Sequence, residues 1–82
     1  MSYVAYILKC SDGTLYCGST TDLDKRLMQH NSSNAGAKYT RGRRPVELVY
    51  HTQAATLKEA RALEAMYKRM TRSQKLILIA TM

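Results

Sequence analysis

The chain has 82 residues, which is enough for one small domain spanning residues 1–82. Its 45% hydrophobic and 23% charged residues are typical of a globular protein and exclude an intrinsically disordered one. No apolar run is longer than six residues, far short of the roughly 20 that cross a bilayer, so we expect no membrane partner. The first residues lack the basic and apolar stretches of a secretion signal, and we therefore expect a cytoplasmic protein.

Positive charge is in excess and is concentrated after residue 24. Thirteen Lys and Arg against six Asp and Glu give a formal charge of +7. Residues 1–24 contain one cation and three carboxylates, a net −2, whereas residues 25–82 contain twelve cations and three carboxylates, a net +9. A basic surface of this size favours a polyanionic partner, most simply nucleic acid.

The first third of the sequence predicts a β-hairpin followed by a helix. Residues 3–10 are β-branched, aromatic and apolar, as in a strand, and the Asp-Gly pair that follows is a turn signal. Residues 15–17 predict a short second strand. Thr21 begins a weak capping box, so a helix is predicted over residues 22–30.

The remaining sequence predicts an exposed loop, a third strand and two helices. Residues 31–44 are polar and basic, as in a loop, and residues 46–52 are typical of a strand. Thr56 forms a capping box with Glu59, which starts a helix that reaches about residue 70. A last helix is predicted from residue 73 to the end.

Two apolar helix faces are expected to cover the sheet. The face of the helix after Thr56 consists of Ala60, Leu63, Met66, Tyr67 and Met70. The last helix is expected to bury Leu76, Ile77 and Ile79. The order strand, strand, helix, strand, helix, helix predicts an α+β fold, in which a three-stranded antiparallel sheet is flanked by helices.

Several side chains are suited to the hydrolysis of a phosphodiester. That reaction needs a group that deprotonates water, a cation that neutralises the developing phosphorane, and usually a carboxylate that holds a divalent metal. Arg26 and His30 are four residues apart on one face of the predicted helix, and Glu64 lies among cations on a later helix. Each also has a purely structural interpretation: a solvated arginine, a helix-terminal histidine, and an ordinary helix salt bridge with Arg61 or Lys68.

A basic segment follows the first predicted helix. Its candidate contacts for nucleic acid are Lys38, Tyr39, Thr40, Arg41, Arg43 and Arg44. Cations interleaved with hydroxyl groups bind phosphates through ion pairs and hydrogen bonds. The alternative interpretation of these residues is a solvated loop.

Short motifs occur in a characteristic order along the chain. Two tripeptides, VAY at residues 4–6 and YCG at residues 16–18, are followed by the helix that carries Arg26 and His30, and then by Glu64. In order and spacing these motifs resemble the GIY-YIG nuclease family, in particular its small stand-alone branch, over about residues 3–80. The sequence GAKYTR at residues 36–41 is a further hallmark of that branch.

The resemblance implies a mechanism for cleaving DNA. Tyr6 or Tyr16 would act as the general base or orient the water, and Arg26 would stabilise the phosphorane. Glu64 would hold one Mg²⁺ or Mn²⁺ ion near the scissile phosphate. The implied catalytic residues are Tyr6, Tyr16, Arg26, His30 and Glu64. DNA is favoured over RNA as the substrate, in repair or recombination, with a larger repair protein as a further partner. The alternative is a non-catalytic nucleic-acid-binding module or adaptor with the same fold.

This mechanism sets two conditions on the tyrosines. A free tyrosine, with a pKa of about 10, is a poor base at neutral pH, so an adjacent cation such as the metal or Arg26 would have to lower its pKa. The two rings must also share a face of the sheet. A two-residue turn would pair Lys9 with Tyr16 and separate the rings, whereas a three-residue loop with a bulge would pair Cys10 with Tyr16 and bring them together. We therefore expect the three-residue loop.

Overall fold

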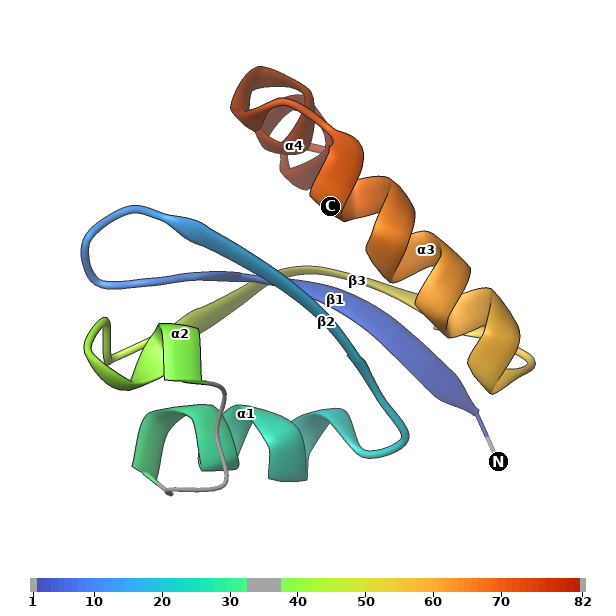
Figure 1. Cartoon of the computed structure of the whole chain (residues 1–82), viewed down its shortest axis with the longest axis horizontal. Coiled ribbons are helices and arrows are strands. Elements are labelled where there is room, and N and C mark those ends of the chain that lie inside the picture. The colour runs from blue at the N-terminus through green and yellow to red at the C-terminus, as the bar shows by residue number, and fades with distance from the viewer. Residues whose placement is uncertain (1, 33–37, 82) are drawn as a thin grey trace.

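The computed structural model describes residues 2–32 and 38–81, in which two helical layers cover the two faces of one sheet (Figure 1). The strands are β1 (Tyr3–Lys9), β2 (Leu15–Thr20) and β3 (Glu47–Ala54). They are antiparallel and lie in the order β2-β1-β3, so that β2 is an edge strand. The helices are α1 (Leu23–Ser32), α2 (Lys38–Arg41), α3 (Leu57–Arg69) and α4 (Arg72–Ile79). The predicted α+β class and the three-stranded antiparallel sheet are confirmed.

Strand β1 is buried on both faces because each face meets a different pair of helices. Ala5 and Ile7 pack with Tyr67 of α3 in one apolar cluster. Tyr6 and Leu8, which alternate with them, belong to a second cluster on the side of α1. The central strand β1 therefore separates two thin cores. Its alternating side chains belong to one core or the other. None of the described helices is long and apolar enough to cross a membrane.

The prediction of an exposed loop over residues 31–44 is wrong for much of that segment. Helix α1 extends to Ser32, and a short helix, α2, covers Lys38–Arg41. Residues 33–37, which include the first two residues of the GAKYTR motif, lie outside the described part of the chain. Helix α1 also starts differently, because Asp22 rather than Thr21 provides its cap: Asp22 Oδ1 accepts from the backbone N–H of Lys25 at 3.1 Å.

The predicted apolar faces of the two C-terminal helices are only partly correct. In α3 the buried face is centred on Ala60 and Tyr67, and Met66 is exposed beside it. In α4, Leu78 and Ile79 pack on the core, whereas Leu76 and Ile77 are exposed. A capping box between Thr71 and Gln74 fixes the start of α4 at Arg72. The helix packs on the core through Leu78 and Ile79, which leaves Leu76 and Ile77 on its solvent side.

The β1–β2 hairpin brings the two candidate tyrosines to one face, as expected, but through a different register. Leu8 pairs with Tyr16, and Tyr6 pairs with Gly18. Cys10 pairs with Thr14 rather than with Tyr16, since its backbone N–H donates to Thr14 O at 2.8 Å. The three-residue loop is closed by Gly13, whose φ of 84° is readily adopted only by glycine. Tyr6, Leu8 and Tyr16 therefore all face α1.

Gly18 provides the space that the phenol of Tyr6 occupies. A Cβ atom at position 18 would lie 2.5 Å from Tyr6 Oη and 2.7 Å from its Cζ, closer than real Cβ atoms approach other atoms. Only glycine at this position leaves room for the Tyr6 phenol against β2. Gly18, the last residue of the second tripeptide, is thus required by Tyr6, the last residue of the first, because the phenol fills the space that any side chain at position 18 would need.

A buried chain of hydrogen bonds joins the sheet to α1 and α2, the two helices on the same face. Tyr6 Oη lies 3.0 Å from His30 Nε2 in α1, and His30 Nδ1 lies 2.9 Å from Thr40 Oγ1 in α2. Tyr6 is 1% exposed, and His30 and Thr40 are 0% exposed. Both ring nitrogens of His30 are therefore satisfied inside the protein, and the three residues fix α1 and α2 to the sheet.

The buried histidine predicts a loss of stability in acid. Burial, followed by the charges of Arg26 and Arg44, lowers the pKa of His30 to about 4, against about 6.5 in the unfolded chain. Between these values the unfolded state binds the extra proton, so we expect unfolding free energy to fall as the pH drops from 6.5 to 4, by at most about 3 kcal/mol. Urea titrations at several pH values measure this. His30→Gln should lose that component of the pH dependence, and exposed His51→Gln should retain it.

The close approach at Gly18 predicts a specific cost for the smallest added side chain. We expect Gly18→Ala to destabilise the fold by about 1–3 kcal/mol, because the methyl group must displace a buried ring. Gly42→Ala is the matched control, since nothing lies within 4 Å of the position of its added Cβ. Urea unfolding of both variants checks the prediction, and equal stabilities would contradict it.

Candidate active site

The candidate catalytic residues lie around the middle of the edge strand β2. Tyr6 lies against Gly18, and its phenol interacts electrostatically with Tyr16, Arg26 and Glu64. These residues come from β1, β2, α1 and α3. Tyr6, Tyr16 and Arg26 lie on the α1 side of β2, and Glu64 lies on the α3 side within electrostatic range of the Tyr6 phenol. The fifth residue that the sequence analysis proposed as catalytic, His30, is hydrogen-bonded to Tyr6.

Tyr6 is held as a neutral phenol. Burial raises its pKa to about 12, and the hydrogen bond from Arg26 offsets only part of that effect. Arg26 by itself therefore does not bring the pKa of Tyr6 below its usual value. Because a guanidinium only donates, the phenol oxygen accepts from Arg26 and its hydrogen is left to donate to His30 Nε2.

Arg26 is oriented from two sides. It is half-buried on α1, and its Nη1 donates to Gln29 Oε1 one turn later at 3.2 Å. The second contact of the guanidinium is its hydrogen bond to the buried phenol of Tyr6. An arginine fixed in this way carries its charge at a defined place beside β2, which is what recognition of a phosphate requires.

Tyr16 is the more accessible of the two motif tyrosines. Its ring contacts the His30 ring edge-on, with centroids 5.2 Å apart, and stacks on the Tyr39 ring at 5.7 Å. It is partly exposed, whereas Tyr6 is buried. Tyr16 also acts electrostatically on Tyr6, on the α1 side of the sheet, and on Lys68 of α3, on the other side.

Glu64 approaches β2 from the opposite face of the sheet. Its Oε1 accepts from Ser19 Oγ at 2.7 Å, and Ser19 faces α3 because it follows Gly18, which faces α1. Its Oε2 accepts from Lys68 Nζ, also at 2.7 Å. Burial by itself raises the pKa of Glu64, but the hydrogen bonds from Lys68 and Ser19 outweigh it, and the net shift is downward. The carboxylate is therefore ionised at neutral pH.

The donor set at Glu64 fits a metal ion that keeps most of its own water. Within the described residues, no three His, Cys, Asp or Glu side chains lie close enough to share a metal. Mg²⁺ is commonly held by one or two carboxylates together with water and substrate phosphate oxygens. A single ionised carboxylate on α3, held at the edge strand β2 by Ser19, matches that pattern.

The basic segment contributes less exposed charge than the sequence suggested. Thr40 is buried against His30 and is not a surface contact. Arg44 donates to the backbone carbonyls of His30 and Gln29, so it caps the end of α1. The side chain of Lys38 lies outside the described part of the structure. Arg41 remains as an exposed cation on α2.

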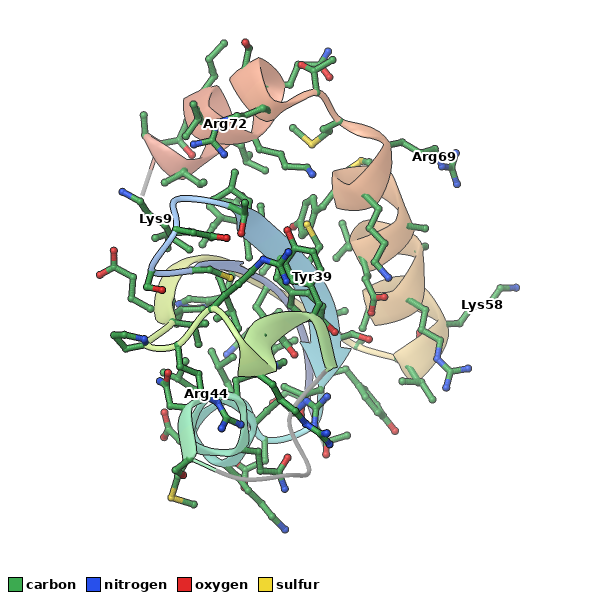
Figure 2. The ribbon with its side chains drawn as sticks, turned by 60° about the vertical axis from the view of Figure 1, so that its left-hand side comes forward. Lys9, Tyr39, Arg44, Lys58, Arg69 and Arg72 are labelled. Carbon is green, nitrogen blue, oxygen red and sulfur yellow. The ribbon has the colours of Figure 1, made fainter. Side chains whose placement is uncertain are left out.

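Tyr39 and Arg43 are held in a stack rather than extended into solvent. The guanidinium of Arg43 lies 4.2 Å from the centroid of the Tyr39 ring, whose other neighbour is the ring of Tyr16. Arg43 also pairs with Asp12 of the hairpin loop, Nε to Oδ2 at 3.1 Å. Figure 2 shows Tyr39 in front of the hairpin, on the side away from Lys58 and Arg69 of α3. The stack ties α2 to the hairpin and flanks Tyr16.

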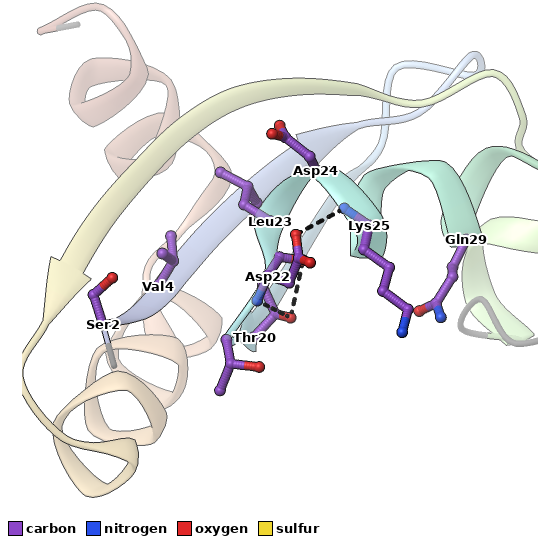
Figure 3. Close-up of a pocket in the computed structure, with 9 residues that line it drawn as sticks. Ser2, Val4, Thr20, Asp22, Leu23, Asp24, Lys25 and Gln29 are labelled. Atoms are coloured by element: carbon purple, nitrogen blue, oxygen red, sulfur yellow. Dashed lines mark hydrogen bonds between the residues drawn. The ribbon is translucent and has the colours of Figure 1, made fainter.

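A separate pocket lies at the start of α1. It has a volume of about 650 Å³ and is lined in part by Thr20, Asp22, Asp24 and Lys25 (Figure 3). The two carboxylates repel phosphate, and Asp22 is already bonded to the backbone of α1. This pocket contains none of the predicted catalytic residues, and we assign the candidate site to the β2 edge instead.

Sequence reasoning missed Ser19 and gave Lys68 only a structural role. Both contact Glu64 directly, one from a distant strand and one from the next turn of α3. The spacing of Glu64 and Lys68 reveals their pairing, because residues four apart on a helix are neighbours. The partnership of Ser19 and Glu64 depends on how α3 lies across the sheet, and no local pattern encodes it.

Comparisons with known proteins agree with the geometry. Residues 2–76 match the family model described as the GIY-YIG catalytic domain. A UPF0213 protein of Bacillus pumilus is 57% identical over 77 residues, which are 94% of this chain and 78% of that protein. A UPF0213 protein of Clostridium perfringens is 52% identical over 81 residues, covering 99% of this chain and 85% of that protein.

Two solved structures share the fold. One is the solution NMR structure of a UPF0213 protein from Bacillus halodurans, with 42% identity and a TM-score of 0.62. The other is that of a protein from E. faecalis, with 43% identity and a TM-score of 0.66. Each alignment covers 99% of this chain and 85% of the solved chain. The family match includes the whole sheet, α1 and α3, and this chain therefore belongs to the GIY-YIG catalytic-domain family.

Proposed function

We propose that this protein is a divalent-metal-dependent endonuclease that cleaves phosphodiester bonds in DNA. A GIY-YIG domain places the chain in a nuclease family and implies binding of nucleic acid. The observation that carries the proposal is that Arg26 hydrogen-bonds to the Tyr6 phenol while Tyr16 and Glu64, both remote from them in the sequence, lie within electrostatic range of the same phenol. A nucleophile-orienting phenol, a fixed cation and an ionised carboxylate are the parts that phosphodiester hydrolysis needs.

The two motif tyrosines have different tasks in this proposal. Tyr6 is 1% exposed, and its pKa of about 12 keeps it protonated at neutral pH, so it is suited to positioning Arg26 and His30. Tyr16 is partly exposed and lies within electrostatic range of Tyr6 and Lys68. We assign to Tyr16 the contact with the attacking water, which its oxygen orients toward phosphorus.

Arg26 and Glu64 act on the phosphate from the two sides of β2. Arg26 donates hydrogen bonds to the oxygens on which charge develops in the transition state. Glu64 would hold the metal, either Mg²⁺ or Mn²⁺, which when bound neutralises charge on the scissile phosphate. Because β2 is an edge strand, a substrate strand can reach both residues without displacing the sheet.

His30 supports the site without touching substrate. It is fully buried, and both of its nitrogens are hydrogen-bonded to Tyr6 and Thr40. Its task in the proposal is to orient the Tyr6 phenol, which in turn orients Arg26. His30 is therefore a positioning residue rather than a catalytic one.

The basic residues near the site favour contacts with the sugar-phosphate backbone. Such contacts position a substrate without reading its sequence. Cleavage directed by the shape of DNA rather than its sequence suits repair or recombination, which is the setting we propose, with a larger repair protein as a further partner.

Loss of the Glu64 charge should abolish cleavage while DNA binding persists. We expect Glu64→Gln to reduce cleavage of linear or branched DNA by about 100-fold or more, as does removal of a group that stabilises the transition state. EDTA should have the same effect on the wild-type protein. Gel assays with labelled substrates measure both, and Glu47→Gln, at the exposed end of β3, is the matched control.

The outcome of that assay separates the proposal from its rival. Cleavage that survives in Glu64→Gln would overturn the assigned role of Glu64. Binding without any cleavage by the wild-type protein in Mg²⁺ or Mn²⁺ would establish a non-catalytic nucleic-acid-binding module.

Removal of the exposed cation on α2 should weaken DNA binding in a salt-dependent way. Arg41→Ala should lower the slope of log affinity against log salt by roughly 0.7–0.9, the value for one lost phosphate contact. Arg69→Ala, which removes the same charge from the far side of α3 (Figure 2), should leave the slope unchanged. Fluorescence anisotropy at several salt concentrations tests this, and equal slopes for the two variants would contradict the assignment.

A further inference from the structure

The two oxygens of the Glu64 carboxylate have different partners. Oε1 accepts from the hydroxyl of Ser19, which is part of the sheet. Oε2 accepts from the ammonium of Lys68, one turn further along α3. Both distances are 2.7 Å, so each oxygen already has one close partner. Ser19 is a short side chain fixed by the backbone of β2, whereas the ammonium of Lys68 lies at the end of a long, flexible side chain.

Lys68 lies on the solvent side of this arrangement. Its side chain is 55% exposed, whereas that of Glu64 is 23% exposed. A cation that enters from solvent therefore meets the ammonium before it meets the carboxylate. The flexible four-carbon stem of lysine allows the ammonium to withdraw without any movement of the helix.

The groups around the ammonium are those of the candidate site. Glu64, Tyr16 and Cys17 raise the pKa of Lys68, the first of them chiefly through the hydrogen bond, while its small degree of burial lowers it. Arg61 is a second cation that acts on Glu64, but its side chain forms no ion pair with the carboxylate in the described structure. Lys68 is thus the cation in direct contact with the proposed metal ligand.

We propose that Lys68 is a displaceable counter-ion that occupies the metal position at Glu64 Oε2. This inference rests on the proposed function, since it takes Glu64 as the metal ligand. Ser19 holds Oε1 and keeps the carboxylate aimed at the β2 edge. A divalent cation that binds at Oε2 displaces the ammonium, because two cations in contact with the same oxygen repel each other. Lys68 keeps the carboxylate in place, and it sets the metal concentration at which the site fills.

Metal binding by the intact chain tests this inference without any measurement of cleavage. In an NMR titration with Mg²⁺, the side-chain carboxyl carbon of Glu64 reports occupancy and the Cε of Lys68 reports release of the ammonium. Both resonances should shift with the same apparent Kd in the wild-type protein. In Lys68→Met we expect Glu64 to bind Mg²⁺ roughly threefold to tenfold more tightly, because a charge-assisted hydrogen bond no longer competes.

Three further variants make the result specific. Lys68→Arg keeps a cation at the same place and should stay within about twofold of the wild-type affinity, since a guanidinium also bonds to carboxylates. Lys58→Met removes one charge from the same helix, away from the site (Figure 2), and should change the affinity by less than about twofold, because exposed distant charges are screened. Glu64→Gln should abolish the saturable response.

The possible failures are distinguishable. If Glu64→Gln abolishes the response but Lys68→Met leaves the affinity unchanged, Glu64 binds metal and the inference about Lys68 is wrong. Equal tightening in Lys58→Met and Lys68→Met would also overturn it, because the effect would then be one of net charge. A titration unaltered by Glu64→Gln would show that the metal binds elsewhere, which would overturn the metal assignment in the proposed function as well.

Discussion

The hydrogen bond between the phenol of Tyr6 and the imidazole of His30 is the interaction on which the site depends. It lies between the sheet and α1, continues through His30 to Thr40 in α2, and is wholly buried. Because a buried polar group is costly unless it is paired, the three residues fix the distance between the layers. That distance in turn places Arg26, which lies one helical turn before His30, beside the same phenol.

A single edge strand organises the site on both faces of the sheet. Gly18 accommodates Tyr6 on one face, and the next residue, Ser19, holds Glu64 on the other. In a central strand these two faces would be separated by neighbouring strands, but the order β2-β1-β3 leaves β2 open along one side. The fold therefore lets residues from two cores act on one substrate that lies along the edge.

The structure also redistributes tasks among the basic residues. Arg43 pairs with Asp12 and packs on Tyr39, and Arg44 caps α1, so both stabilise the fold around Tyr16. Lys68, which an i, i+4 pattern assigns to an ordinary surface salt bridge, contacts the one carboxylate proposed to bind metal. Some of the cations that make up the net positive charge thus stabilise the fold around the site, and others are exposed to a polyanionic partner. The amino-acid composition alone does not show which cation belongs to which group.

The sequence by itself determined the α+β class, the motif order and the identity of the candidate residues, because these follow from local periodicity, capping boxes and spacing. The face on which Tyr16 lies was decided by the hairpin register, and a slip of one residue would have moved its ring to the other side of the sheet. Burial of His30 and Thr40, exposure of Leu76 and Ile77, and the contact of Ser19 with Glu64 were decided only by the packing of helices on the sheet. Such contacts join residues far apart in the chain, and their geometry exists only once the layers have assembled.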